Sequence, residues 1–567
     1  MKHGHRFVMV ALVAGMLAVA LVPLTAGSQG ARAQAGGIIY VDADAAGANN
    51  GASWRHAFTD LQDALDEAEP LDQIWVAEGT YKPTRQFIDD DPRSATFQMV
   101  NGAAIFGGFD PGTGVTKFAD RDWVANETIL SGNIGDLDRS DDNSYHVFYH
   151  PEGTNLDGSA LLDGFTIIGG NADLVDYPGG VCGGGVYNEG SSPTLGNITL
   201  VGNSAFDRGG GVYNEGSSPV LTGCLFSDNF AQVGGAIYNL DGSSPTLIDC
   251  TFSSNAVFDY GGAMFNNDHS SPVLNNCAFS GNSAFSGGGG AIYNRYGSSP
   301  KLAGCTFLDN VTLGDGGGIY NVGSSPVLTN CSFTGNSAEG SGGAVYNLSS
   351  SSSTLTNCIL WGDSSPEIES LFSSPIVTYS DIQGGYVGEG NIELDPRFVE
   401  PDSGDLHLQP DSPCIDAGDN DALNLPQYDV DGDPRILDGN GDGYAVVDMG
   451  ADEFKTPAIW VDIDVTPYVP SNVIKLGSPR RVPVAILSTE EFNAVAEVAP
   501  DSVYFAGAPH VGFTFVDVDN DDDEDVLLDF RARDMVDLDE DSTEATLTGE
   551  TQDGVPFEGT DEVKVIP

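Results

Sequence analysis

Residues 234–255 read GGAIYNLDGSSPTLIDCTFSSN, and residues 261–282 repeat the pattern as GGAMFNNDHSSPVLNNCAFSGN. Related units recur from Gly183 to Cys358, and the Pro of each Ser-Ser-Pro turn falls at positions 193, 219, 245, 272, 300 and 326, which are 26 to 28 residues apart. Each unit contains two short apolar runs separated by turns rich in Gly, Ser and Pro. Self-similarity at such a period is typical of a solenoid.

The two runs in each unit indicate β-strands and not helices. Leucine-rich repeats have a similar period, but they need a Leu-rich frame and a helical return, and these units offer Gly, Ser and Asn instead. Runs that alternate apolar and small polar residues predict coils that stack about 4.8 Å apart. We therefore predict an all-β fold, a right-handed parallel β-helix that is clearest in residues 180–360.

The flanks extend this solenoid and add further parts. We expect the β-helix to occupy residues 36–415, an acidic terminal segment residues 416–455, and a small β-sandwich-like domain residues 456–567. Before the first coils, Phe58, Leu61, Leu65 and Ala68 fall on one helical face. A short helix should therefore cover the N-terminal end of the solenoid.

The first 35 residues have the features of an export signal. Lys2 and Arg6 precede an apolar run over residues 7–24, and small residues follow at Ala31, Ala33 and Ala35. A single-pass membrane anchor is the rival interpretation, but no basic stop-transfer residues follow the run. We predict a signal peptide, an extracellular or cell-surface location, and no membrane span in the mature chain.

The charge of the chain excludes one class of partner. The 83 Asp and Glu residues outnumber the 22 Lys and Arg residues, which gives a net charge of -61. Such a chain repels a phosphate backbone, so we exclude nucleic acid. The charge is compatible with divalent cations or with a salty exterior that screens it.

Two ladders of identical residues are expected in the stacked coils. One consists of Cys224, Cys250, Cys277, Cys305, Cys331 and Cys358. Thiols stacked in parallel register point the same way, which suits a disulfide poorly, and we expect small buried thiols. The other consists of Asn188, Asn214, Asn239, Asn266, Asn294, Asn321 and Asn347, whose amides can hydrogen-bond from coil to coil.

A third ladder is aromatic and is our candidate binding surface. Its members are Tyr187, Tyr213, Tyr238, Phe265, Tyr293, Tyr320 and Tyr346. If Ile237 and its equivalents point inward, alternation turns these rings outward, where they can stack on sugar rings or on another protein. In the reverse register the rings are core. The sequence leaves both open, and we favour the outward register.

Calcium is the expected ion, and the first candidate site lies in the acidic terminal segment. Asp429, Asp431 and Asp433 alternate along the chain. Asp438, Asn440 and Asp442 then reproduce the start of an EF-hand loop. The twelfth position holds Met449 in place of Glu, so a looser Ca²⁺ loop is expected. Charged, soluble turns without metal are the alternative.

The second candidate calcium site lies in the C-terminal domain. Its members are Asp517, Asp519, Asp521, Asp523 and Asp525. In an extended strand, alternate carboxylates share a face without meeting at one point. They can hold an ion together only if the segment turns.

The repeat blocks resemble those of a known group of proteins. GGAI and FSDN-type blocks are similar to the GGA(I/L/V) and FxxN repeats of the polymorphic outer-membrane proteins of chlamydiae, within the pectate-lyase-like β-helix superfamily. ILWGDSSPEI and SPCIDAGDND resemble the segment called choice-of-anchor Q. Residues 456–567 look like a β domain appended to many exported bacterial proteins, in which Gly stands where this chain has Asn520 and Asp522. The resemblance implies the fold and a surface location.

An enzymatic function is the alternative, since pectate-lyase-like coils can carry lyases and hydrolases. A lyase needs a basic residue beside a Ca²⁺-neutralised carboxylate, and a hydrolase needs two carboxylates roughly 5–9.5 Å apart. Asp228 and Asp309 are three coils apart, about 14 Å by strand spacing. The best remaining place is the N-terminal flank, where Asp89–Asp91 lie in one loop and residues 136–150, with His146 and His150, in another.

We assign no catalytic residue from the sequence. The favoured hypothesis is a secreted or cell-surface scaffold for adhesion, which binds a polysaccharide or a cell-surface or matrix protein. The alternative is a polysaccharide lyase or glycoside hydrolase. A groove with clustered carboxylates beside Arg85, Arg93 or Arg139 would favour the alternative.

Overall fold

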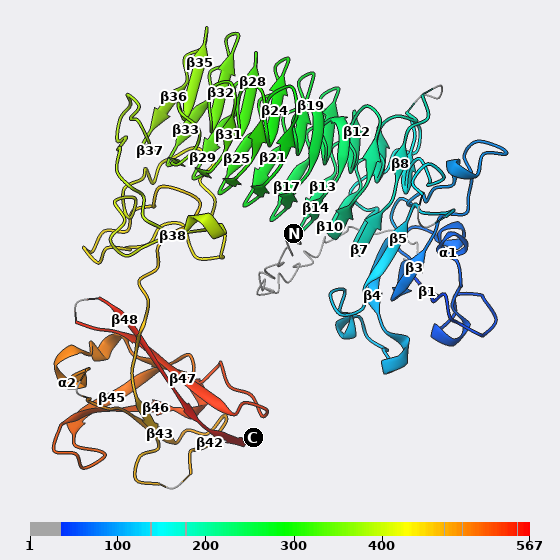
Figure 1. Cartoon of the computed structure of the whole chain (residues 1–567). Coiled ribbons are helices and arrows are strands. Elements are labelled where there is room, and N and C mark those ends of the chain that lie inside the picture. Colours follow the sequence, from blue (N-terminus) through cyan, green and yellow to red (C-terminus); the bar gives the residue numbers. More distant parts are fainter. Residues whose placement is uncertain are drawn as a thin grey trace, which may run out of the picture.

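The computed structural model describes residues 36–136, 139–175, 179–469, 471–489, 491–552 and 554–566. The expected signal peptide lies outside the described residues. The chain forms a long right-handed parallel β-helix, followed by an irregular terminal segment and a C-terminal β domain (Figure 1). The predicted fold class is confirmed.

Each regular coil contributes strands to three parallel sheets, in strict register with the coils before and after it. Val212, Tyr213 and Asn214 of one coil, for example, align with Ile237, Tyr238 and Asn239 of the next. The largest sheet bends within the clear repeats at a corner that reads Gly-Cys, Asp-Cys or Asn-Cys, so that most coils enter it twice.

The strands of the first arm of the largest sheet are β1 (Ile38–Val41), β2 (Gln73–Ala77), β4 (Ala104–Phe109), β7 (Leu161–Ile168), β10 (Thr194–Val201), β13 (Val220–Thr222), β17 (Thr246–Ile248), β21 (Val273–Asn275), β25 (Lys301–Ala303), β29 (Val327–Thr329), β33 (Thr354–Thr356) and β36 (Ile376–Thr378). Those of the second arm are β3 (Gly79–Tyr81), β5 (Thr128–Ser131), β14 (Leu225–Ser227), β18 (Thr251–Ser253), β22 (Ala278–Ser280), β26 (Thr306–Leu308), β30 (Ser332–Thr334), β34 (Ile359–Leu360) and β37 (Asp381–Ile382).

Two further sheets complete the coil. One contains β6 (Phe148–His150), β9 (Val186–Glu189), β12 (Val212–Glu215), β16 (Ile237–Leu240), β20 (Met264–Asn266), β24 (Ile292–Arg295), β28 (Ile319–Val322), β32 (Val345–Leu348) and β35 (Ile368–Leu371). The other contains β8 (Asn171–Ala172), β11 (Ser204–Ala205), β15 (Phe230–Val233), β19 (Ala256–Tyr260), β23 (Ser283–Ala284), β27 (Val311–Thr312) and β31 (Ser337–Ala338).

The interior of the solenoid is a stack of like residues. Phe226, Phe252, Phe279, Phe307 and Phe333 are buried and stacked, with successive ring centroids 4.3 to 4.8 Å apart. The ladder cysteines lie in the same core, and each is a free buried thiol, as expected. Close packing of rings at the coil spacing makes this the main apolar core of the chain.

The Asn ladder predicted from the repeats is confirmed. Each Asn from Asn188 to Asn321 donates its Nδ2 to Oδ1 of the next member at 2.8 to 3.1 Å. A second ladder, Asn203, Asn229, Asn255, Asn282, Asn310 and Asn336, supports the opposite corner in the same way. These amides pair polar groups that are fully buried.

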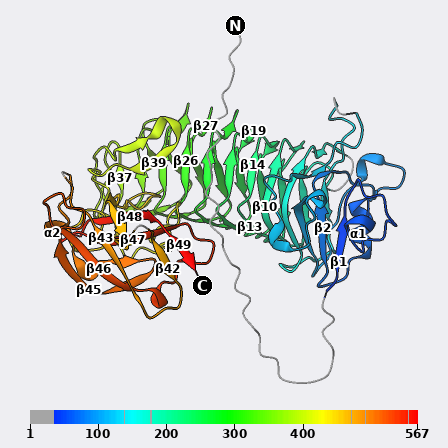
Figure 2. The same ribbon diagram turned by 90° about the horizontal axis from the view of Figure 1, so that it is seen from below.

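A helix lies at the N-terminal end of the solenoid, as predicted. Helix α1 (Leu61–Glu67) begins after Asp60, whose side chain accepts a hydrogen bond from the backbone N–H of Gln62. Leu61 and Leu65 are buried in the interior core against the first strands. Figure 2 shows the helix beside β1 and β2 at this end. None of the helices in the described ranges is long and apolar enough to cross a membrane.

The regular coils end near Ile382, and the terminal segment then lies along the flank of the solenoid. A hairpin of β38 (Phe398–Glu400) and β39 (Asp405–Leu408) leads into it. Asn276 donates to the carbonyl of Asp429, and Asn330 donates to the carbonyl of Asp448. These contacts join residues more than a hundred positions apart.

The C-terminal β domain has its own hydrophobic core. Its strands are β40 (Ile459–Trp460), β41 (Ile463–Val465), β42 (Val473–Lys475), β43 (Arg481–Ile486), β44 (Tyr504–Phe505), β45 (Ala508–Val516), β46 (Asp525–Arg531), β47 (Glu544–Glu550), β48 (Pro556–Glu562) and β49 (Lys564–Ile566), with helix α2 (Ala494–Glu497) between β43 and β44. β45 and β46 form an antiparallel hairpin.

Candidate functional site

The aromatic ladder faces away from the solenoid core, but it is not an exposed surface. Ile237 lies in the interior core, and its neighbour Tyr238 belongs to a separate aromatic cluster, so the favoured register is found. However, Tyr187, Tyr213, Tyr238, Phe265, Tyr293 and Tyr346 are buried and Tyr320 is half-buried. The expectation of an open stripe for stacking on sugars is corrected on this point.

Part of the cover over these rings comes from residues that precede the Gly-Gly turns of three coils. Val181, Val233 and Tyr260 lie over the aromatic cluster. The rings also cover one another, since Tyr213 and Tyr238 stack with centroids 5.8 Å apart. Burial of large aromatic area stabilises the coils, so this ladder has a structural role.

A different set of apolar side chains is exposed along the solenoid. Phe206 is 64% exposed, Phe258 52%, Phe285 49% and Leu313 52%. Half-buried Phe230 lies beside Phe258, with ring centroids 5.0 Å apart. We call these five residues the exposed apolar strip.

The strip arises because its positions recur in the repeat. Phe206, Phe258, Phe285 and Leu313 each stand three residues after an Asn of the second ladder. The backbone N–H of Phe285 donates to the carbonyl of Val257, and that of Leu313 donates to the carbonyl of Ala284. Phe258, Phe285 and Leu313 therefore follow one another at the coil spacing, and Gln232 takes the equivalent position in the coil between Phe206 and Phe258. The repeat pattern of the strands does not predict the strip; its signal in the sequence is an apolar residue three positions after an Asn of the second ladder.

Polar side chains border the strip. Gln232 donates to Asp259 at 2.6 Å, and the hydroxyl of Ser286 donates to the other oxygen of Asp259 at 2.9 Å. A row of apolar side chains beside fixed amide, hydroxyl and carboxylate groups can take a partner that has both apolar and hydroxyl surface.

The two loops suggested as a hidden active site contact each other, since the hydroxyl of Tyr145 donates to Asp91 and Arg93 donates to the carbonyl of Asn143. His146 and His150 are fully buried, and burial lowers the pKa of each to about 4. Arg85 pairs with Asp66, Arg93 with Asp173, and Arg139 with Asp141. The three arginines thus pair with aspartates of three different segments.

An open cleft of about 360 Å³ lies where the terminal segment meets the first sheet arm. Its walls are residues 424–428 on one side and residues of β21 and β25, with Asn276, on the other. Lys301 is its one ionisable cation among the lining residues, and no lining residue is Asp, Glu or His. Lys301 and Tyr428 are the ionisable groups among these lining residues.

The first three alternating aspartates of the terminal segment do not share a site. One oxygen of Asp429 accepts from the N–H groups of Asp431 and Asp433, and the other accepts from that of Glu453. Asp433 pairs with Lys455 at 2.9 Å. Asp431 points instead to His407. The expected Ca²⁺ set is thus divided among separate partners.

The EF-hand-like stretch is an exposed loop held by its own backbone. Asp438 accepts from the N–H groups of Asp442 and Gly443, and Asn440 also accepts from Asp442. The carboxylate of Asp442 accepts from Tyr444. These are local turn hydrogen bonds, which Asp and Asn form without any ion.

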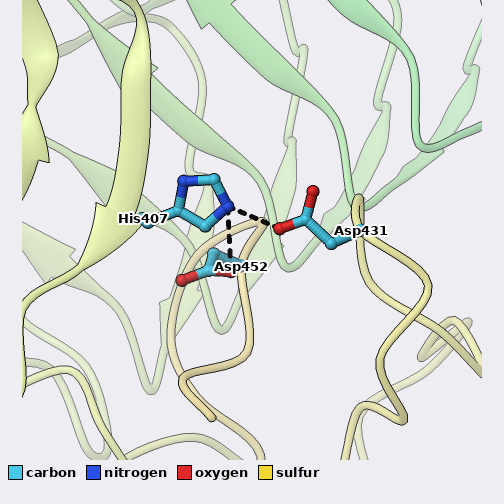
Figure 3. Close-up of side chains that lie close together, drawn as sticks. All are labelled: His407, Asp431 and Asp452. Atoms are coloured by element: carbon cyan, nitrogen blue, oxygen red, sulfur yellow. Dashed lines mark hydrogen bonds and ion pairs between the residues drawn. The ribbon is translucent and has the colours of Figure 1, made fainter. Parts of the chain in front are cut away.

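A histidine and two aspartates meet where the hairpin contacts the terminal segment (Figure 3). His407 Nε2 lies 2.5 Å from Asp431 Oδ2 and 4.0 Å from Asp452 Oδ1, while Nδ1 lies 2.5 Å from Asp405 Oδ1. Burial alone would lower the pKa of His407, but the hydrogen bonds to Asp431 and Asp405 raise it to about 9. Burial raises the pKa of Asp452 to about 6.

In the C-terminal domain, three of the five alternating aspartates converge. Asp517, Asp519 and Asp525 offer carboxylate oxygens that lie within 4.8 Å of one another. The segment turns between β45 and β46, and Asn520 and Asp522 have positive φ angles of 66° and 76°. Gly adopts such angles most readily, and the resemblance noted in the sequence analysis implies Gly at these two positions.

The other two aspartates of that set stand apart. Asp521 accepts from the backbone N–H of Asp523 in a local turn, and neither belongs to the converging group. Asp525 is fully buried, and its two oxygens accept from the N–H groups of Ser488 and Val518. It is therefore fixed in place, with lone pairs left for an ion.

Comparison with known proteins gives a family match in the solenoid. The model of the family described as "Right handed beta helix region" matches residues 157–307 and 259–377. No curated protein matches the sequence.

Solved structures with some likeness to the chain include three that are 10–15% identical to it. The pectate lyase Pel9A is 15% identical, with 74% of this chain and 97% of that chain covered and a TM-score of 0.43. A rhamnogalacturonan lyase is 14% identical, with 64% and 91% covered and a TM-score of 0.42. The tailspike protein gp49 of Acinetobacter baumannii bacteriophage Fri1, a capsular polysaccharide depolymerase, is 10% identical, with 94% and 78% covered and a TM-score of 0.28.

Proposed function

We propose that this chain is an exported, non-enzymatic scaffold that binds a glycan along the exposed apolar strip. The observation that carries the proposal is the row of exposed apolar side chains at three successive coils, formed by Phe258, Phe285 and Leu313, with Phe206 two coils before Phe258. Exposed apolar patches of this kind mark binding surfaces. The function rests on the outer surface of a rigid solenoid and uses no catalytic group.

A glycan suits the strip better than a flat apolar protein surface does. The faces of sugar rings carry C–H groups that can lie on aromatic side chains, while their hydroxyls need hydrogen-bonding partners at the edge. Asp259, Gln232 and Ser286 provide such partners beside Phe258 and Phe285. The net charge of -61 favours a neutral polysaccharide, because a polyanion would be repelled.

The test is retention of the full mature chain on insoluble neutral polysaccharides, compared with Phe258→Ser and Phe285→Ser. We expect each substitution to weaken retention on the order of 10-fold, since aromatic contacts contribute about 1 kcal/mol beyond their buried area. Phe372→Ser is the matched control, because Phe372 is 81% exposed and lies outside the strip. Retention by all three variants at the level of the unchanged chain would contradict the proposed surface.

The same samples distinguish binding from catalysis. Release of reducing or unsaturated sugars is measured with and without Ca²⁺, and we expect none. Release of such sugars would contradict the non-enzymatic proposal and support a polysaccharide lyase or hydrolase. If the chain binds a protein and no glycan, and the Phe258 and Phe285 variants lose that binding, the strip is the binding surface but its partner is a protein.

We also infer that Ca²⁺ binds at Asp517, Asp519 and Asp525. The support is the turn that brings these carboxylates together, together with the oxygen donors that Ca²⁺ prefers. The ion would fasten the loop between β45 and β46. This site belongs to the C-terminal domain and is independent of glycan binding.

A further inference from the structure

The cluster of His407, Asp431 and Asp452 has the donor set of a transition-metal site. One imidazole nitrogen and two carboxylate oxygens, each from a different residue, lie within 4.8 Å of one another. Imidazole donors favour ions such as Zn²⁺, whereas Ca²⁺ and Mg²⁺ take oxygen ligands. The imidazole donor therefore suits this cluster to a different ion than the all-aspartate group of the C-terminal domain.

The second nitrogen of the histidine supplies an independent indication. Nδ1 of His407 lies 2.5 Å from Oδ1 of Asp405, two residues earlier in β39. A carboxylate that holds the N–H of a metal-ligating imidazole is the usual outer partner of a protein-bound zinc ion, because it fixes the ring and leaves the other nitrogen to the metal. Nε2 is the nitrogen that faces Asp431 and Asp452.

The two carboxylate ligands differ in how firmly the structure holds them. Asp452 is 7% exposed, and its other oxygen accepts from the backbone N–H of Leu408 at 3.0 Å, so its position is fixed. Asp431 is exposed and lies in a loop, and can move outward from its hydrogen bond with His407 to make room for an ion. An ion between them would sit about 2.0–2.2 Å from each donor.

We propose that His407, Asp431 and Asp452 form a Zn²⁺ site with Asp405 as the supporting carboxylate. The ion would join three segments, β39, the loop at residues 429–433 and the chain at residues 450–454, and so fasten the terminal segment to the hairpin that precedes it. This inference goes beyond glycan binding and does not depend on it. A site with three protein ligands keeps a position for water.

Binding of Co²⁺ to the full mature chain without an affinity tag tests the site, since Co²⁺ gives visible absorption bands and Zn²⁺ displaces it. We expect one Co²⁺ at this site and a weakening of about 100-fold or more in His407→Gln and in Asp452→Asn. Asp405→Asn leaves all three ligands in place and should weaken binding about 10- to 100-fold. His269→Gln is the control, because His269 is exposed, lies 3.7 Å from Asp268 and is outside the cluster.

The outcomes decide the proposal. Circular dichroism shows whether the variants are folded, and if His407→Gln is not, Asp405→Asn decides. Hydrogen exchange of residues 426–434 should slow on addition of Zn²⁺ in the unchanged chain and in His269→Gln, but not in His407→Gln. Absence of bound Co²⁺ and Zn²⁺, or equal binding by the unchanged chain and Asp405→Asn, would overturn the site and leave a hydrogen-bonded His–Asp cluster.

Discussion

The repeated coils and the acidic terminal segment bury polar groups in opposite ways. In the coils, each ladder Asn is paired with the same residue one coil away, as Asn239 is with Asn266. In the terminal segment each partner is different: Asp448 accepts from the N–H groups of Asp416 and Phe454, and buried Arg435 donates to the carbonyls of Gly450 and Ala451. In the coils, the hydrogen-bond partner of each ladder residue is set by the repeat along the solenoid axis. In the terminal segment, the partners depend on how residues 416–455 fold.

The largest expected effect comes from interrupting a ladder. Asn255 accepts from the backbone N–H and Nδ2 of Asn229, and donates to Phe226 O and to Asn282 Oδ1. Asn255→Ala leaves these groups unpaired in a dry interior, and we expect the free energy of unfolding of the solenoid to fall by about 3–5 kcal/mol. Chemical denaturation followed by circular dichroism measures it.

The matched control for that substitution lies in the terminal segment. Asn440 is exposed and accepts one local hydrogen bond, from the N–H of Asp442, so Asn440→Ala should change stability by about 0.5 kcal/mol or less. Similar losses in Asn255→Ala and Asn440→Ala would mean that the ladder contributes no more than an ordinary turn.

A smaller effect is expected from pH, with opposite signs at the two ends of the solenoid. His150 occupies the ladder position before Asn188 and donates to it at 2.8 Å, and burial lowers the pKa of His150 from 6.5 to about 4. Between these pH values the unfolded chain binds a proton that the folded chain does not. Acidification from pH 7 to 5 should therefore cost the first coils about 2 kcal/mol for this residue.

At the other end the linkage is reversed. Burial raises the pKa of Asp381 from 3.8 to about 6, so the folded chain holds a proton that the unfolded chain has lost. The same acidification should stabilise the last coil by about 1 kcal/mol. Hydrogen exchange of residues 145–150 and 376–382 reports both ends in one sample.

His150→Asn tests the assignment. The substitution continues the Asn ladder and removes the titrating group, so residues 145–150 should lose much of their acid sensitivity while residues 376–382 keep their response. His146 remains, and its pKa is also lowered to about 4 by burial. Unchanged acid sensitivity at residues 145–150 would exclude His150 as its source.

The comparison also explains what the sequence could reveal. The period, the inward Phe and Cys positions and the Asn188 ladder were all predictable, because in a solenoid each residue's main partner is its own equivalent. The exposure of the aromatic ladder was not predictable, since residues such as Val233 and Tyr260, at the ends of β15 and β19 in a different sheet, pack over it. The pairing of His407 with Asp431 and Asp452 was also not predictable, because these residues are not at equivalent positions of a repeat.

The calcium sets show the same limit. Alternating aspartates occur in the terminal segment and in the C-terminal domain, and the sequence could not rank them. A turn at Asn520 and Asp522 gathers three carboxylates in one case, while local turns and separate partners occupy Asp429, Asp433 and Asp438 in the other. The geometry of one loop decides, and positive φ at non-Gly residues is difficult to predict from sequence.

The smallest expected effect is the response of the C-terminal domain to Ca²⁺. At ion concentrations about four times a dissociation constant typical of extracellular modules, the domain should gain about 1 kcal/mol of stability. Asp519→Asn should remove this gain, because Asp519 is exposed and its loss leaves the buried Asp525 in place. Asp438→Asn should keep the gain in full. Isothermal titration calorimetry with Ca²⁺ measures binding by the unchanged chain and both variants. Loss of binding in Asp438→Asn alone would contradict the site in the C-terminal domain and assign Ca²⁺ to the terminal segment. The turns around Asp438 would then have to open to receive the ion.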